Sequence, residues 1–409
     1  MNTLCRRMHC IVPPHMLDKL LENNDRNIRD AALATLLTTS HLRGERSARA
    51  LNSAQGANGN ARRTIFDCRN SSVLADAALA RTEDGQDASD ASVNRAFDGL
   101  GTTRDFYKDI LKRDSIDGLG MRLNAFVHRG NGYQNAFWDG QQMIFGDGDG
   151  IVFADFTLSL DVIAHELTHG VTEFAAGLVY QHQPGALNES ISDVFGCLVK
   201  QWSRGENAEE ADWLIGSELF TPAIATDAMR SLKAPGTAYN NALFGKDPQP
   251  DHMKRYVVLP NNEKGDWGGV HINSGIPNKA FYLAAVGIGG GAWESAGHIW
   301  YQSLLASNAF TQFQEFADTT ALKAAQIHGF GSFEHKAVSA AWDEVGIRTS
   351  SAMSAARSTD PHQGSRLSSR NTLSRDQDSF ARFSKQIETL AAQVRSLSKD
   401  MQSLRSSKR

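Results

Sequence analysis

The sequence lacks the features of a disulfide-stabilised, strongly charged or membrane-spanning protein. Its four cysteines, Cys5, Cys10, Cys68 and Cys197, are scattered over 409 residues. Without a Cys-x-x-Cys pair, they do not form a disulfide framework. The net charge of -4 gives no field of one sign that would attract nucleic acid. The most apolar stretch, 280–293, is too short to span a bilayer and contains a run of glycines.

A signal for export is also missing from the start of the sequence. Two early arginines are not followed by an apolar run, which argues against a Sec-type signal peptide. We therefore expect the chain to be cytoplasmic, or to be released without such a signal. What is present is 41% hydrophobic and 22% charged residues, as in ordinary globular proteins. The length allows two or three domains with a sizeable core.

Changes in composition along the chain predict five segments. A helical apolar pattern at 16–39 precedes a stretch rich in Arg, Ser, Asn and Gly at 42–63, which indicates a small leader and a flexible connector. Short apolar runs between Gly and Asp turns then predict strands, and longer helical patterns follow from about residue 158. The predicted segments are a leader with its connector (1–60), a strand-rich lobe including the helix near 160–175 (61–185), a helical lobe (186–349), a disordered linker (350–374) and an amphipathic helix (375–409).

Apolar residues recur in alternating steps of three and four near the C-terminus. They are Phe380, Phe383, Ile387, Leu390, Val394, Leu397, Met401 and Leu404. This a/d heptad pattern predicts a coiled coil through which the chain forms a homo-oligomer. A single amphipathic helix that packs on its own domain is the alternative. The turn-rich run 146–150 could bind a cation, but a plain turn is favoured there.

The pentapeptide at 165–169 carries the strongest chemical signal. On a helix, His165 and His169 lie one turn apart on the same face, so both imidazoles can bind a single Zn2+. Glu166 leaves the adjacent side, where it can reach a water molecule at the metal without binding the metal itself. A surface helix with two solvated histidines is the alternative. Apolar flanking residues favour a buried helix, in which unpaired polar groups would cost about 1–3 kcal/mol each.

A second helical stretch is expected to complete the metal site. Glu189 and Asp193 are four residues apart and so share one helix face. We expect Glu189 to be the third zinc ligand, and Asp193 to accept the free N–H of a zinc-bound imidazole. A solvated acidic face is the alternative. Two histidines and one glutamate leave a coordination position open, which is typical of catalytic rather than structural zinc.

An open position on zinc predicts hydrolysis by an activated water molecule. Glu166 would take the proton of this water as general base and pass it to the leaving amine. The oxyanion that forms needs donors. His271 is a candidate, since the glycines before it allow a close approach of the backbone, and Asp266 can keep its imidazole oriented or protonated. A lone histidine is more often structural, which is the alternative for His271.

Four motifs together resemble the thermolysin family of zinc metalloendopeptidases. They lie at 135–140, 162–169, 185–193 and 269–275, and the resemblance extends from about residue 64 to residue 347. It implies an α+β fold with a strand-rich N-terminal lobe and a helical C-terminal lobe. The zinc helix would lie between them at the floor of a cleft. The implied activity is the hydrolysis of peptides and proteins, with no nucleic-acid partner.

The resemblance also implies roles for individual residues. Tyr180 and His271 would donate to the transition state, with Asp266 supporting His271. Arg230 would contact a substrate carbonyl, and the implied preference is cleavage before bulky hydrophobic residues. The implied sites are zinc at His165, His169 and Glu189, the base at Glu166, an orienting carboxylate at Asp193, a substrate-binding edge at Asn135 and Ala136, and an apolar pocket at Phe153, Val162, Ile215 and Met229.

The sequence departs from the family at its double calcium site. Asp161 and Asp212 remain, but Lys200, Leu214 and Ser217 stand where acidic residues are expected. An ammonium group would repel Ca2+ or replace it as counter-charge. We therefore predict that the calcium pair is lost.

The leader resembles that of the protealysin-like subgroup, which carries a Pro-Pro pair followed shortly by leucine. Here the pair is Pro13 and Pro14, with Leu17 after it. This implies an inhibitory propeptide, removed by self-cleavage between about residues 42 and 63. Cys10 could cap the zinc as a thiolate, although an ordinary buried or free cysteine is favoured.

Two other functions are compatible with parts of the sequence. A non-catalytic oligomeric scaffold would use the heptad tail and keep the peptidase fold only as a framework. A zinc hydrolase acting on something other than peptides would keep the metal site. The complete set of ligands, base and donors argues against the scaffold, and the edge motif at Asn135 and Ala136 favours peptides.

Overall fold

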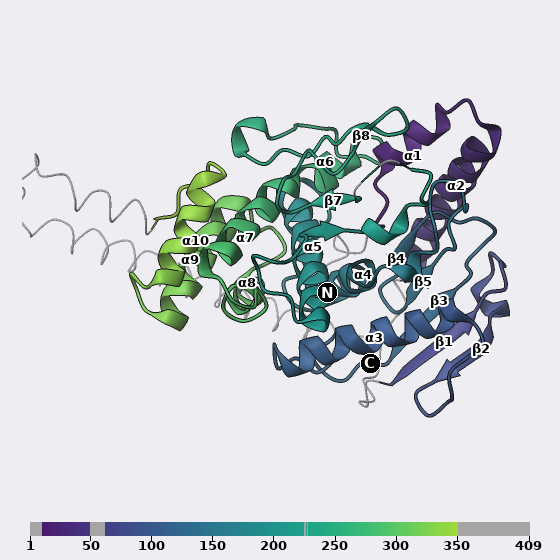
Figure 1. The fold of residues 1–409 in the computed structure, drawn as a ribbon, viewed down its shortest axis with the longest axis horizontal. Helices are drawn as coiled ribbons and strands as arrows, with labels where there is room; N and C mark the ends of the chain where they lie inside the picture. The colour runs from purple at the N-terminus through teal and green to yellow at the C-terminus, as the bar shows by residue number, and fades with distance from the viewer. Residues whose placement is uncertain (1–9, 50–61, 225, 227, 351–409) are drawn as a thin grey trace, which may run out of the picture. The chain divides into compact units, whose positions relative to one another are not determined.

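The computed structural model describes residues 10–49, 62–224, 226 and 228–350. The predicted coiled coil and nearly all of the predicted linker before it lie outside these residues. Figure 1 shows a sheet on one side, helices α7 to α10 on the other, and helices α4 and α5 between them. Among the described residues, no helix combines the length and apolar character needed to cross a bilayer.

A five-stranded sheet forms most of the strand-rich half, with the strand order β2-β1-β3-β5-β4. The pairs β1–β3 and β3–β5 are parallel, and the pairs β1–β2 and β4–β5 are antiparallel. Strand β4 therefore lies at an edge, where its unpaired backbone groups can bind another chain. The strands are β1 (Arg63–Asp67), β2 (Ala78–Thr82), β3 (Leu123–Val127), β4 (Ala136–Trp138) and β5 (Met143–Phe145).

A long helix in this half was not predicted. Helix α3 (Ala91–Asp109) packs on β1, β3 and α4, and the side chain of Asp90 caps its N-terminus by accepting from the backbone N–H of Ser92 and Val93. Two glycines within α3 obscured its helical pattern. They serve packing instead, since a Cβ atom at Gly99 would lie 2.5 Å from Cδ1 of Ile163.

Two buried helices pack side by side at the centre of the described chain. They are α4 (Leu160–Phe174) and α5 (His182–Arg204), and they contain the two motifs at 165–169 and 188–193. Helix α5 starts seven residues before the expected Glu189, and Gly205 in the left-handed conformation (φ 66°) follows its last residue and ends the helix. The expected helix at 160–175 agrees with α4 to within one residue.

The leader forms two helices, α1 (Pro14–Leu21) and α2 (Arg26–Arg49). Pro14 occupies the first position of α1, where the N–H that proline lacks has no helical partner. Helix α2 extends to Arg49, so the prediction of a flexible connector from residue 42 was wrong over its first eight residues. Residues 50–61 are not described.

The helical half contains five further helices and pairs of very short strands. Helix α7 packs against α8 and α10, and α9 packs against α8 and α10. The helices are α6 (Asp266–Asn273), α7 (Gly275–Ile288), α8 (Ser295–Ala306), α9 (Phe313–His328) and α10 (Phe333–Glu344). The short strands are β6 (Leu214–Ile215), β7 (Arg230–Ser231), β8 (Asn240–Asn241) and β9 (Gly245–Lys246), and the 3-10 turns are η2 (Leu74–Asp76), η3 (Phe156–Leu158), η4 (Ser217–Leu219) and η5 (Met253–Arg255).

Candidate active site

Helices α4 and α5 approach closely because a glycine lies between them. A Cβ atom at Gly196 would lie 2.6 Å from the carbonyl oxygen of Asp161 and 3.5 Å from Cβ of His165. Its absence lets α5 lie directly against the face of α4 that carries the histidines. His165, Glu166 and His169 are all fully buried, so the alternative of a solvated surface helix is excluded.

Three potential ligand side chains meet between the two helices. Nε2 of His165 lies 3.0 Å from Nε2 of His169. Oε2 of Glu189 lies 3.6 Å from the first nitrogen, and Oε1 of Glu189 lies 3.5 Å from the second. A tetrahedral zinc site with bonds of about 2.0–2.1 Å has edges of roughly 3.3–3.4 Å. The three separations lie within about 0.4 Å of these edges, so the two imidazoles and the carboxylate are close enough to bind one zinc ion.

The other nitrogen of each imidazole faces an acceptor. Nδ1 of His165 lies 2.8 Å from Oδ1 of Asp193. Nδ1 of His169 lies 2.8 Å from Oδ1 of Asn188 and 3.0 Å from the hydroxyl of Ser192. Because these partners favour a proton on Nδ1, both Nε2 atoms present lone pairs to one another.

These residues fit a bound cation. The lone pairs of two nitrogens 3.0 Å apart repel each other unless a cation lies between the nitrogens and is bound by both. Oε2 of Glu189 is buried and has no hydrogen-bond partner among the described residues. Such an atom is costly unless something else binds it. Imidazole and carboxylate together are a typical donor set for Zn2+.

Glu166 lies beside this cluster. One ligand atom each from His165, Glu166 and His169 fall within 4.8 Å of one another. The backbone N–H of Trp138, on edge strand β4, donates to Oε2 of Glu166 at 3.1 Å. The carboxylate is thus fixed between the candidate metal site and the edge of the sheet.

Tyr180 and His271 lie together on the other side of Glu189. The hydroxyl of Tyr180 donates to Oε1 of Glu189 and lies 3.1 Å from Nε2 of His271. Burial alone would lower the pKa of His271, but Asp266 at 2.6 Å from Nδ1 and the Glu189 carboxylate outweigh it and raise the pKa to about 9. Burial raises the pKa of Tyr180, and Glu189 raises it further. Both side chains are therefore protonated donors near neutral pH.

The backbone before His271 is held in an unusual conformation. Asp266, Trp267, Gly268 and Gly269 all have positive φ angles, between 49° and 87°. Two of the four are glycines, which adopt this region without strain. The turn brings both oxygens of Asp266 to His271, since Oδ2 also accepts from its backbone N–H at 2.8 Å.

Arg230 is held by the carboxylate that faces His165. Its Nη2 donates to Oδ1 of Asp193 at 2.7 Å, and its Nε donates to Oδ2 at 2.8 Å. Burial alone would raise the pKa of Asp193, but the Arg230 guanidinium and His165 outweigh it and hold the pKa well below its usual range. Asp193 is therefore a stable anion in the interior.

The first described residues of the leader contact this site through their backbone. The N–H of Ile11 donates to the carbonyl of Ala136 at 3.3 Å, and the N–H of Val12 donates to Oδ1 of Asn135 at 3.0 Å. The carbonyl of Ile11 accepts from Nη1 of Arg230 at 3.2 Å. Further contacts of the leader are between the Cys10 carbonyl and His271 Nε2 (3.1 Å), His15 Nε2 and the Tyr239 hydroxyl (2.9 Å), and the Thr39 and Tyr133 hydroxyls (3.0 Å).

The predicted pocket residues are all apolar side chains of the interior. Phe153, Val162 and Ile215 are fully buried, and Met229 is nearly so. Ile215 pairs with Arg230 across strands β6 and β7, which brings this group near the docked leader. Ile11 itself is fully buried.

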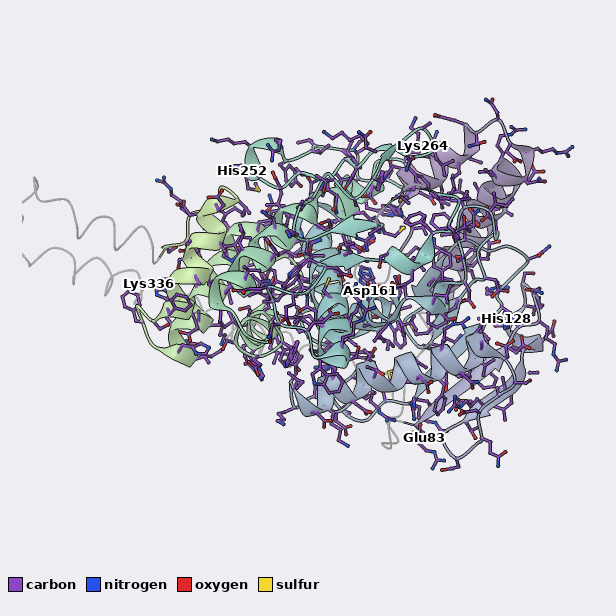
Figure 2. The ribbon with its side chains drawn as sticks, viewed as in Figure 1. Glu83, His128, Asp161, His252, Lys264 and Lys336 are labelled. Carbon is purple, nitrogen blue, oxygen red and sulfur yellow. The ribbon has the colours of Figure 1, made fainter. Side chains whose placement is uncertain are left out.

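Lys200 lies between the two acidic residues that the sequence analysis assigned to the family's calcium site, whose loss stays a prediction. Nζ of Lys200 lies 2.8 Å from Asp161 and 3.1 Å from Asp212, and it donates to the carbonyl of Leu214 at 2.7 Å. Burial alone would lower the pKa of Lys200, but Asp161 outweighs it and raises the pKa. Asp161, labelled in Figure 2, belongs to the first turn of α4. The run at 146–150 is a turn in which Oδ1 of Asp149 accepts from the backbone N–H of the residues at 151–153.

Comparison of the sequence with models of known protein families identifies the family of this chain. Residues 46–173 match the model of the thermolysin metallopeptidase catalytic domain, and residues 176–347 match that of its alpha-helical domain. The chain belongs to the thermolysin family. It is therefore a metallopeptidase, as its relatives are.

Several relatives share most of the thermolysin-family region. An extracellular metalloprotease from Pectobacterium carotovorum subsp. carotovorum is 46% identical over 344 residues, which cover 82% of this chain and 96% of that protein. Protease PrtS from Photorhabdus sp. (strain Az29) is 43% identical over 348 residues, which cover 83% of this chain and 92% of that protein. Thermolysin from Bacillus sp. (strain EA1) is 39% identical over 69% of this chain and 50% of its own length. The solved precursor of protealysin from Serratia proteamaculans has a TM-score of 0.74 at 46% identity, over 83% of this chain and 99% of that one.

Some residues at the site were not predicted to act there. Asn188 and Ser192 contact His169, and the side chain of Gln249 donates to the carbonyl of His271 at 2.7 Å. Asn188 and Ser192 flank predicted residues on the same helix, so helical spacing could have indicated them. Gln249 comes from a loop and gives no such signal.

Proposed function

We propose that this chain is a zinc endopeptidase made as a precursor whose leader blocks its own substrate cleft. The observation that carries this proposal is the docked segment Cys10 to Val12. It contacts Asn135, Ala136, Arg230 and His271, four groups for which the sequence suggested a role in binding or activating a peptide.

Zinc would be held by His165, His169 and Glu189. The close approach of the two imidazoles and the carboxylate, and the buried Oε2 of Glu189, support this ligand set. When bound, Zn2+ supplies Lewis-acid activation of water and of the substrate carbonyl. Glu166 is the proposed general base, which takes a proton from the attacking water and delivers it to the leaving amine.

The negative charge that develops on the carbonyl oxygen would be stabilised by Tyr180 and His271. The carbonyl of Cys10 already accepts a contact of this kind from Nε2 of His271 at 3.1 Å. A donor aimed at the oxyanion typically lowers the activation free energy by about 3–4 kcal/mol. Asp266 accepts a hydrogen bond from Nδ1 of His271 and so fixes the orientation of the ring.

The substrate would bind where the leader does, along the edge of the sheet. Asn135 and Ala136 would receive its N–H groups, and Arg230 would donate to the carbonyl after the bond to be cut. In the leader, the residue between these contacts is Ile11, whose side chain is fully buried. This supports a preference for cleavage before bulky hydrophobic residues.

Self-processing would release the leader from the cleft. A peptidase of this type needs an extended segment of substrate, and α2 is helical as far as Arg49, while β1 begins at Arg63. We therefore propose cleavage within residues 50–61.

The test compares the full-length chain with Glu166→Ala by mass spectrometry of the purified products. The parent chain should lose its leader and then hydrolyse peptides, and this activity should disappear with a zinc chelator. Glu166→Ala should remain full length. Equal processing of both chains would contradict the assignment of Glu166 and of self-cleavage. A folded, processed chain without peptidase activity would favour the alternative of a non-catalytic scaffold.

A further inference from the structure

The carboxylate of Asp193 is shared by partners from three separate elements. His165 on α4 faces its Oδ1, and Arg230 on β7 reaches both oxygens. Nδ2 of Asn278, on α7, donates to Oδ2 at 2.9 Å, although it is 85 residues away along the chain. Oδ1 therefore lies between Arg230 and the imidazole, while Asn278 and Arg230 hold Oδ2.

Asn278 occupies this position at a cost. It is fully buried, and its Oδ1 has no hydrogen-bond partner among the described residues. A buried acceptor of this kind costs about 1–3 kcal/mol. The reverse orientation of the amide would direct Oδ1 at the anionic Asp193, so the donor end must face the carboxylate.

We propose that Asn278 is a positioning residue for the metal centre, which it influences through Asp193. The inference rests on the proposed function, because it requires that His165 binds zinc. A carboxylate that accepts the N–H of a metal-binding imidazole orients the ring and raises its basicity. Arg230 already donates to both oxygens of Asp193. Loss of the Asn278 donor therefore leaves Arg230 as the one remaining side chain, among the described residues, that holds the carboxylate in place, and the position of Oδ1 relative to His165 is then less well fixed.

The test measures the dissociation constant for Zn2+ by competition with a metallochromic chelator. The parent is the full-length chain with Glu166→Ala, so that no chain processes itself during the titration. Asn278→Leu removes the amide but keeps most of the volume. Loss of a direct partner of a metal ligand typically weakens binding 10- to 100-fold, and we expect a value near the lower end, about tenfold, because Asn278 acts one step further away.

The control is Gln201→Leu, which also removes a buried amide from the interior. Gln201 lies on α5, the helix of Glu189 and Asp193, and both polar atoms of its side chain have no hydrogen-bond partner among the described residues. The zinc affinity of this variant should stay within about twofold of the parent, since the Gln201 side chain makes no hydrogen bond to a proposed ligand within the described part of the chain. Asn278→Ser, whose hydroxyl is too short to reach Asp193, should weaken zinc binding as Asn278→Leu does, and it covers the case that the leucine variant fails to fold.

The unfolding midpoint of the zinc-free chain separates positioning from packing. A purely structural role for Asn278 would lower this midpoint and leave the zinc dissociation constant of both variants within about twofold of the parent. That result would overturn the inference. A parent chain that binds no stoichiometric zinc would overturn the proposed function, and the inference with it.

Discussion

His15, on leader helix α1, faces the peptidase part of the chain, where a second proton on its imidazole is unfavourable. Its Nε2 contacts the hydroxyl of Tyr239, and its Nδ1 is buried without a partner among the described residues. Burial lowers the pKa of His15 from 6.5 to about 4. Asp266 opposes this shift, whereas His271 and Arg230 add to it. Acid should therefore loosen the leader.

The sign and size of the effect follow from proton linkage. The docked leader binds fewer protons than the free leader between the two pKa values, so docking has its full strength above about pH 6.5 and weakens as the pH falls towards 4. At about pH 5 the free His15 is mostly protonated and the docked one mostly neutral. This weakens docking about 30-fold, or roughly 2 kcal/mol.

Inhibition of the processed chain by a leader peptide measures this effect. A peptide of residues 10–49 is compared with the same peptide carrying His15→Gln, whose amide can accept from the hydroxyl of Tyr239 but does not titrate. The ratio of the two inhibition constants cancels the pH dependence of the enzyme itself. This ratio should change about 30-fold between about pH 7.5 and pH 5. If both peptides weaken in parallel, His15 does not control docking.

Other perturbations test the leader and the buried lysine. Lys200→Met leaves Asp161 as a buried anion without its main partner, so we expect it to lower the free energy of unfolding by about 3–5 kcal/mol in thermal melts. The control Lys336→Met, at an exposed position, should change the free energy of unfolding by less than about 0.5 kcal/mol. Calorimetric titration of the parent should show no tight uptake of calcium at two adjacent sites, and such uptake would refute the predicted loss. Ile11→Asp buries a charge and should raise the inhibition constant of the leader peptide about 100-fold or more. Cys10→Ala should leave the precursor latent, because the backbone carbonyl of Cys10 makes the contact with His271; early activation would instead favour a thiolate cap.

The central helices could be predicted from the sequence because their signals are local. The spacing of His165 and His169 fixes a shared helix face, and Glu189 and Asp193 repeat that spacing on the next helix. Both stretches are also apolar on their remaining faces, so burial could be inferred. The structure brings these four side chains together, as the sequence analysis expected. Helix α3 was missed because its internal glycines suggested turns.

Contacts between distant segments could not be predicted in the same way. Asn278 meets Asp193, and Cys10 meets His271 across 261 residues, only because the chain folds back on itself. No periodicity links such pairs. Tyr180 and Arg230 were expected at the site through the family resemblance alone. The predicted coiled coil and the homo-oligomer it would form concern residues that the structure does not describe, and they stay predictions.

The most direct measurement determines the metal content and activity of the processed chain together. Elemental analysis of the purified protein should give one zinc per chain. Removal of the metal by a chelator should abolish peptide hydrolysis, and addition of Zn2+ should restore it. A folded, processed chain that contains no stoichiometric zinc, or that hydrolyses peptides equally well without it, would contradict the account.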